Sequence, residues 1–159
     1  MTQTLKKPIK HLEIRTYRRL AHIYLDNQED LQEVLSDLGI SNTEFDLLAL
    51  VHANAGIAQQ DLAAGLLVSA PNITYHVQRL AQRGLLERTS SGKFKCLHLT
   101  PEGTALIEKA LPRVIQHHEE QFSGLSREEQ LTLNHLLQRV KKDRDRRKKQ
   151  RKNKESIST

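Results

Sequence analysis

Residues 69–84 follow the period of an α-helix that has two different faces. Ile73, Val77 and Leu80 fall at positions i, i+4 and i+7, which places them on one apolar stripe. The opposite side carries polar side chains, namely Asn72, Tyr75, Arg79 and Gln82. The pattern predicts a helix over Ala70–Arg83 with a polar face turned outward.

The ends of this helix, and the segment before it, together predict a helix-turn-helix. The hydroxyl of Ser69 can cap the first turn, and Pro71 is tolerated there because first-turn amides lack helical acceptors. Gly84 suits the left-handed residue that ends a helix. A second short apolar-periodic segment, Gln59–Leu67, lies directly upstream, although Ala58 stands where a capping Ser or Thr is expected. Two short helices across a tight turn are typical of this motif.

A β-hairpin is predicted directly after the second short helix. Residues 85–88 continue as an extended run, residues 89–92 form a turn, and residues 93–100 return as a second strand. The basic side chains of the hairpin are Arg88, Lys93 and Lys95. A basic hairpin in this place indicates a DNA-binding wing, and the alternative is a small α+β packing unit with no role in DNA binding.

Apolar-periodic segments on both sides of this region predict further helices. A long helix begins at about Ile9 and ends at Gly39, and its apolar face is too broad for one small neighbour to cover. We therefore expect it to pack against another subunit or against several helices. The next helix begins at a capping box, Ser-Asn-Thr-Glu, at residues 41–44.

Two more helices are predicted after the wing. Thr100, Pro101 and Glu102 open the first of them, and Pro112 is expected to kink or interrupt it. A second capping box at residues 126–129 begins the last helix. The predicted fold class is mostly α with a small β-hairpin wing, a winged helix-turn-helix with N- and C-terminal dimerisation helices.

Charge is distributed unevenly along the chain. The net charge is +6, and residues 141–154 hold 10 of the 25 Lys and Arg and 2 of the 19 Asp and Glu, so this segment carries +8 and the remainder −2. Residues 26–46, in contrast, contain seven acidic residues and no Lys or Arg. A segregated basic surface suits a nucleic-acid partner.

These observations define the expected domain organisation. We expect residues 1–140 to form one domain, with its DNA-binding part at about residues 41–103. Residues 141–159 are expected to form a disordered basic tail, because they are almost entirely polar and strongly charged.

Several other classes of protein are disfavoured by the sequence. It has no phosphate-cradling Gly-rich loop and no nucleophile with a recognisable base, so we expect no enzyme, no catalytic residues and no cofactor. His117 and His118 diverge by about 100° on a helix, which gives a metal site little support. The single Cys96 suits a reducing compartment, and no apolar run reaches membrane-spanning length. A cytoplasmic location is therefore expected.

The order of these elements resembles the MarR/SlyA family of bacterial transcription regulators. The resemblance covers residues 12–140. The residues that carry it are Asp61-Leu62-Ala63, Leu66, Ser69, Ile73-Thr74, Gln78-Arg79-Leu80, Arg83-Gly84-Leu85, Leu97-His98-Leu99-Thr100-Pro101-Glu102-Gly103 and Leu125-Ser126-Arg127-Glu128-Glu129.

The resemblance implies a dimer formed by the terminal helices and binding of an operator in the major groove. It also implies, for many members, a small-molecule effector site, whose residues are unknown in this chain. The expected partners are double-stranded DNA, a second copy of the chain and a small-molecule effector. The predicted DNA-binding residues are Ser69, Pro71, Asn72, Thr74, Tyr75, Gln78, Arg79, Arg88, Lys93 and Lys95.

The predicted function is thus a dimeric repressor that recognises a pseudo-palindromic operator through the helix Ala70–Arg83 and a basic wing. Many family members carry an Asp-x-Arg motif in the wing that reaches a minor groove, and residues 90–95 lack it, so Lys93 and Lys95 are expected to contact phosphate. Two alternatives stay open. One is a winged-helix protein-interaction module whose acidic residues 26–46 meet a partner, and the other is a sequence-independent architectural DNA binder led by the basic tail.

Overall fold

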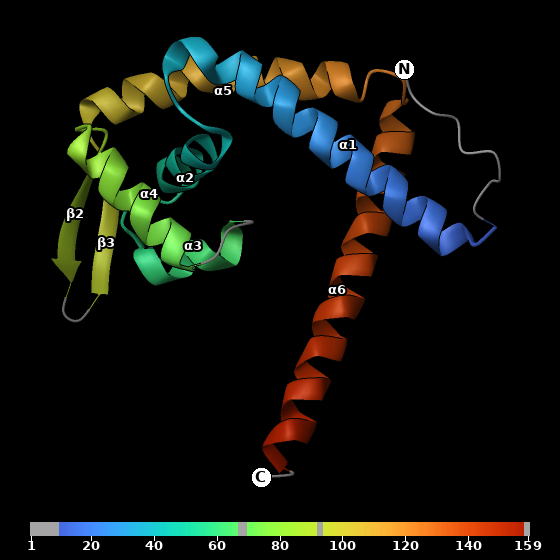
Figure 1. Ribbon diagram of the computed structural model, residues 1–159. Coiled ribbons are helices and arrows are strands. Elements are labelled where there is room, and N and C mark those ends of the chain that lie inside the picture. Colours follow the sequence, from blue (N-terminus) through green and yellow to red (C-terminus); the bar gives the residue numbers. More distant parts are fainter. Residues whose placement is uncertain (1–9, 67–69, 92–93, 158–159) are drawn as a thin grey trace. The chain divides into compact units, whose positions relative to one another are not determined.

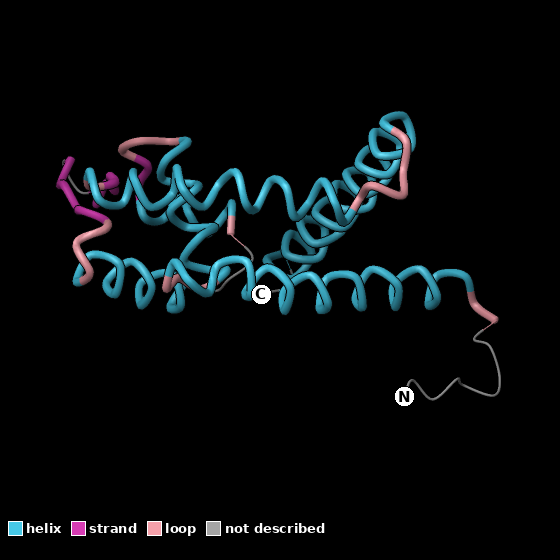
Figure 2. Tube along the Cα trace, turned by 90° about the horizontal axis from the view of Figure 1, so that it is seen from above, coloured by secondary structure: helices cyan, strands magenta, loops and turns pink. Residues whose placement is uncertain are grey.

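The computed structural model describes residues 10–66, 70–91 and 94–157, and most of these residues are helical (Figures 1 and 2). The chain divides after His117 into two compact units. The first unit holds the helix-turn-helix and the wing, and the second consists of the end of one helix and the whole of the last. No helix within the described ranges is long and apolar enough to cross a membrane.

The first two helices are joined by a tight turn. Helix α1 (Leu12–Leu35) runs into a short 3₁₀ helix, η1 (Ser36–Leu38), and ends as predicted at Gly39, whose φ of 64° is left-handed. Helix α2 (Asn42–Ala53) begins at the predicted capping box: the Glu44 amide donates to Ser41 Oγ at 3.2 Å, and the Ser41 amide donates to Glu44 Oε2 at 2.9 Å.

The helix-turn-helix consists of α3 (Gln59–Gly65) and α4 (Ala70–Gln82), which Figure 1 shows in green. Ala58 lies at the N-cap of α3 and supplies no side-chain cap, as the sequence indicates. The predicted stripe of α4 is confirmed, because Ile73, Val77 and Leu80 are at most 2% exposed. Gly84 follows α4 with a φ of 70°.

The sheet has three antiparallel strands within the described residues, in the order β1-β3-β2. The wing hairpin is formed by β2 (Leu86–Ser91) and β3 (Phe94–Leu99), with Leu86 opposite Leu99. The prediction of a turn at residues 89–92 is wrong for residues 89–91. These residues extend β2, because the antiparallel pairing that begins at Leu86 and Leu99 continues to Ser91 and Phe94. The sequence did not indicate β1 (Ile57–Ala58), which pairs with Leu97 and Cys96.

Helix α5 (Pro101–Gln121) packs its first turn directly on the base of the wing. An added Cβ at Gly103 would lie 1.9 Å from the Leu85 carbonyl oxygen, so only a glycine fits this approach. Pro112 lies inside α5 without ending it, and the predicted interruption does not occur. One missing amide is tolerated because Ile107, Ala110 and Val114, on both sides of the proline, are buried in the core.

The core of the first unit is aliphatic, with Phe45 as the only aromatic side chain among its described buried residues. Leu35 of α1, Leu48 of α2, Leu62 of α3 and Leu97 of β3 are all 0% exposed. A surface ion pair adds to this packing, since Arg113 Nη1 lies 2.6 Å from Asp37 Oδ1. The hydrogen bond from Arg113 holds the pKa of Asp37 below its ordinary value.

In the second unit, α6 (Arg127–Ile157) begins at the predicted second capping box. The Ser126 amide donates to Glu129 Oε2 at 2.8 Å, which lowers the pKa of Glu129. The structure differs from the prediction of a disordered tail, because α6 continues without a break through residues 141–157. Lys, Arg and Gln are good helix formers, and Asp143 pairs with Arg146 and with Arg147 one turn ahead.

Candidate nucleic-acid interface

The outward face of α4 carries exposed polar side chains. Pro71, Asn72, Tyr75 and Gln78 are all exposed, and Tyr75 retains 59% of its accessible surface. The Tyr75 ring meets His76 edge-on, with 5.2 Å between the ring centroids. Because Ile73, Val77 and Leu80 anchor the other face in the core, these exposed side chains are presented on a rigid element.

Thr74 lies on the same exposed face and also connects the two helices of the motif. Gln59, at the start of α3, donates from Nε2 to Thr74 Oγ1 at 3.2 Å. This bond fixes the beginning of α3 to the first half of α4. Thr74 is therefore both a predicted DNA contact and a structural link.

Arg79 occupies a different environment from the other predicted contacts on α4. Its Nε lies 3.2 Å from Glu44 Oε1, and Arg83 Nη1 lies 3.5 Å from Glu44 Oε2. The Glu44 side chain is only 1% exposed, whereas the side chains of Arg79 and Arg83 are 50% and 33% exposed. Oε1 accepts no hydrogen bond, so the Arg79 contact is an ion pair without hydrogen-bond alignment.

The wing places two of the three predicted cations on one face of the hairpin. Arg88 of β2 pairs with Leu97, and Ser90 pairs with Lys95 of β3. Side chains opposite each other, and those two residues along a strand, share a face, so Arg88 and Lys95 are diagonal neighbours. Both are exposed, whereas Leu86 and Leu97, which share this face, are buried. Lys93 and Ser69 lie outside the described residues.

The remaining side chains with metal-binding or redox chemistry are dispersed. His117 Nε2 lies 2.8 Å from Asn27 Oδ1, a contact between α5 and α1 within the first unit. Cys96 is half-buried in β3. Across residues 10–66, 70–91 and 94–157, no three His, Cys, Asp or Glu side chains are grouped as metal ligands.

The chain is similar to bacterial transcription regulators along most of its length. A sequence profile of the MarR family matches residues 38–93. The Multiple antibiotic resistance protein MarR of Salmonella typhimurium is 31% identical over 125 residues, which are 74% of this chain and 87% of that protein. The HTH-type transcriptional regulator YkoM of Bacillus subtilis is 30% identical over 127 residues, which are 78% of this chain and 82% of that protein.

The chain belongs to the MarR family. A mutant MarR from E. coli, solved in complex with operator DNA, is 28% identical with a TM-score of 0.73, and the match covers 84% of this chain and 99% of that chain. The predicted fold class, a winged helix-turn-helix with a small sheet, is thereby confirmed. MarR-family proteins are transcription regulators and not enzymes, so the interface described above belongs to a regulator.

Glu44 is a charged residue of this MarR-family interface that the sequence did not reveal as part of it. Its capping-box role was predicted from Ser41, and that role holds. The only further signal in the sequence is the spacing of Arg79 and Arg83, which lie four residues apart and therefore on one side of α4. Nothing in the local pattern links those arginines to an acid on another helix.

Proposed function

We propose that this MarR-family chain is a homodimeric repressor that binds a pseudo-palindromic site in duplex DNA. In this proposal, α4 enters the major groove and the wing contacts the flanking phosphates. The observation that carries it is the two-sided character of α4, with Ile73, Val77 and Leu80 buried and Asn72, Tyr75 and Gln78 exposed. The E. coli MarR mutant was solved in complex with operator DNA, which supports duplex DNA as the partner of this chain.

The exposed side chains divide by chemistry into base readers and phosphate contacts. Asn72 and Gln78 carry amides, which can bond to the N6 and N7 edge of adenine. Thr74 and Tyr75 suit phosphate oxygens or a thymine methyl group, and Pro71 is placed to pack at the start of α4. Arg88 and Lys95 supply positive charge to the wing, and Ser69 and Lys93 stay predictions from the sequence.

Dimer formation is supported by apolar side chains that the single chain leaves exposed. On α1 these include Tyr17 at 70% and Leu25 at 58%, and on α6 they include Leu136 at 47% and Val140 at 65%. Exposed apolar surface concentrated on the terminal helices is typical of a subunit interface. A two-fold dimer presents two copies of α4 and therefore favours half-sites about one helical turn apart.

Repression is proposed as the output because a dimer that covers an operator excludes other proteins from the same stretch of duplex. Control by a small molecule stays a prediction from the family resemblance, and no residue is assigned to it.

The experiment that tests this function is the selection of bound fragments from genomic DNA of the source organism. We expect enrichment of one pseudo-palindromic sequence, tighter binding to it than to a shuffled duplex, and lower output from a reporter placed downstream when the protein is present. Equal binding to selected and shuffled DNA would favour the architectural alternative instead. That alternative has one specific observation behind it, the helical basic segment at residues 141–157.

A further inference from the structure

A single buried carboxylate holds the C-terminal end of α4 against α2. Glu44 is 1% exposed and belongs to the first turn of α2, where its side chain accepts the capping-box hydrogen bond from the Ser41 amide. Arg79 and Arg83 reach this carboxylate from the last turn of α4 and from the residue after it. Two partly exposed guanidinium groups are thus paired with a carboxylate that is buried.

This ion cluster lies at the C-terminal end of α4. Asn72, an amide that can read adenine, lies in the first turn of α4, and the second exposed amide, Gln78, comes before Arg79 in the helix. The N-terminal part of a recognition helix is the part that meets base edges. Arg79 and Arg83 lie at the other end and point to α2. An arginine released from Glu44 has enough exposed surface to swing outward, since half of Arg79 and a third of Arg83 are already accessible.

We infer that Glu44 is a specificity-determining residue, which withdraws Arg79 and Arg83 from the DNA phosphates and so leaves readout to the exposed residues of α4 that precede Arg79. This inference rests on the proposed function. Phosphate contacts add affinity on every sequence equally, whereas base contacts distinguish sequences. Pairing both arginines with a buried acid therefore lowers non-specific affinity more than it lowers affinity for the preferred site, and raises the ratio between them.

The test is the variant Glu44→Gln, compared with the unmodified full-length chain on preferred and shuffled duplexes. Gln preserves the capping box and removes the charge. We expect tighter binding to shuffled DNA, a lower ratio between preferred and shuffled sites, and a steeper dependence of affinity on salt. Each released arginine that reaches a phosphate adds about −0.9 to the slope of log K against log salt, so two contacts change the response to fourfold salt by about 12-fold.

The chain offers a matched control in its second capping box. Glu129→Gln makes the same chemical change at the same position of a helix, but Glu129 is exposed and makes no ion pair among those of the described residues. We expect Glu129→Gln to leave both the salt slope and the site preference unchanged. An equal change in both variants would overturn the inference, because it would show a general effect of lost charge.

A second variant tests the arginines directly and does not depend on Glu44→Gln being folded. In Arg79→Gln/Arg83→Gln, Glu44 keeps amide partners, and we expect the salt slope on shuffled DNA to match that of the unmodified chain. A slope shallower by about 1.8 would mean that both arginines contact phosphate, and would overturn the inference. The proposed function fails if the unmodified chain shows no preference between the selected and shuffled sites. If the unmodified chain shows a preference and a folded Glu44→Gln variant keeps it unchanged, only the proposed role of Glu44 fails.

Discussion

Asn72 is the residue on which sequence readout by α4 depends most directly. It is exposed, it lies in the first turn of the helix, and the neighbouring Ile73 is buried and holds the backbone in place. We predict that Asn72→Ala costs about 1–3 kcal/mol on the preferred site and relaxes the choice of one base in each half-site. Fluorescence anisotropy with single-base variants of the site measures both effects.

A matched control for this prediction lies at the other end of the same helix. Gln82 is also an exposed amide, but it is the last residue of α4. Gln82→Ala should leave the preference among sites unchanged. Asn72 is not a base reader if Asn72→Ala weakens binding to preferred and shuffled DNA by the same factor.

The contrast between Asn72 and Arg79 shows how much of the interface follows from the sequence. Helical period alone places both side chains on the outer surface of α4, and both are exposed in the structure. The period does not show that Arg79 also pairs with Glu44, 35 positions earlier in the sequence. The conformation of a long flexible side chain at the edge of a helix face depends on contacts with residues distant in the sequence. Helical periodicity cannot predict those contacts.

At the scale of elements, the junction between the wing and α5 depends on a backbone contact. We predict that Gly103→Ala destabilises the protein by roughly 1–3 kcal/mol, as overpacking does, even though Ala is the better helix former by about 1 kcal/mol. The added Cβ would lie 1.9 Å from the Leu85 carbonyl oxygen and 2.9 Å from its carbon, and backbone atoms cannot rotate away. Urea unfolding followed by circular dichroism measures the change.

Gly124 provides the comparison for this prediction, because a Cβ added there meets nothing within 4 Å. Gly124→Ala should change the free energy of unfolding by no more than about 0.5 kcal/mol, as at other open surface positions. Equal stabilities for the two variants would show that α5 and the wing can separate without cost.

Elements specified by neighbouring residues were predicted well, and elements specified by distant partners were not. The capping boxes at Ser41 and Ser126 need only side chains three residues apart, and both are present. Strand β1 is two residues long and exists because Leu97 and Cys96 of β3 pair with it. The basic segment after Val140 was expected to be disordered because it cannot form a core, yet its Lys, Arg and Gln residues individually favour the helix that the structure shows.

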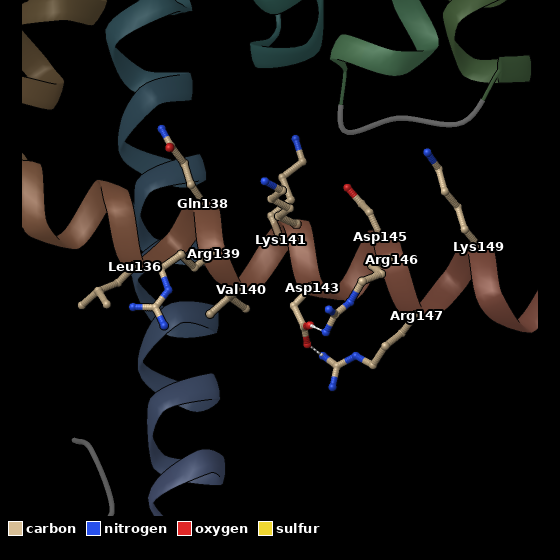
Figure 3. A pocket seen from close by; sticks show the side chains of 11 residues that line it. Leu136, Gln138, Arg139, Val140, Lys141, Asp143, Asp145, Arg146, Arg147 and Lys149 are labelled. Atoms are coloured by element: carbon tan, nitrogen blue, oxygen red, sulfur yellow. Dashed lines mark hydrogen bonds and ion pairs between the residues drawn. The ribbon is translucent and has the colours of Figure 1, made fainter.

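At the scale of the whole molecule, the proposed dimer can be tested by substitutions on the apolar surface of α6. Leu136 is 47% exposed in the single chain, and Figure 3 shows it pointing to the opposite side of α6 from Gln138. We predict that Leu136→Asp dissociates or unfolds the protein, because obligate interfaces are apolar and large, roughly 2,000 Å² or more. Gln138→Asp adds the same charge on the other side of the helix and should leave the dimer intact. Sedimentation velocity at micromolar concentration decides this, and a stable monomer of the unmodified chain would contradict the proposal.

The basic end of α6 leads to a prediction about how strongly the whole molecule responds to salt. Residues 141–154 carry ten cations, and cationic side chains extend from opposite sides of this helix, as Lys149 and Arg147 do in Figure 3. Only Asp143 among the described acids of this segment pairs with them, through Arg146 and Arg147. A helix of this kind reaches about 25 Å beyond Val140 and can contact phosphates without reading bases.

We predict that a chain ending at Val140 binds all duplexes more weakly at low salt, shows a shallower salt slope, and keeps nearly the same preference among sites. Each lost phosphate contact changes the slope by about 0.9, so three contacts reduce the response to a fourfold rise in salt by about 40-fold. A full-length variant with Lys148, Lys149 and Arg151 replaced by Gln keeps the helix length and most of its helix propensity, and should give part of the same effect. If the truncated protein is folded and dimeric and its salt slope is unchanged, the prediction is wrong and residues 141–157 are a solvated helix end without DNA contacts. Loss of site preference on truncation would instead mean that the segment contacts bases, because phosphate contacts alone carry no sequence information.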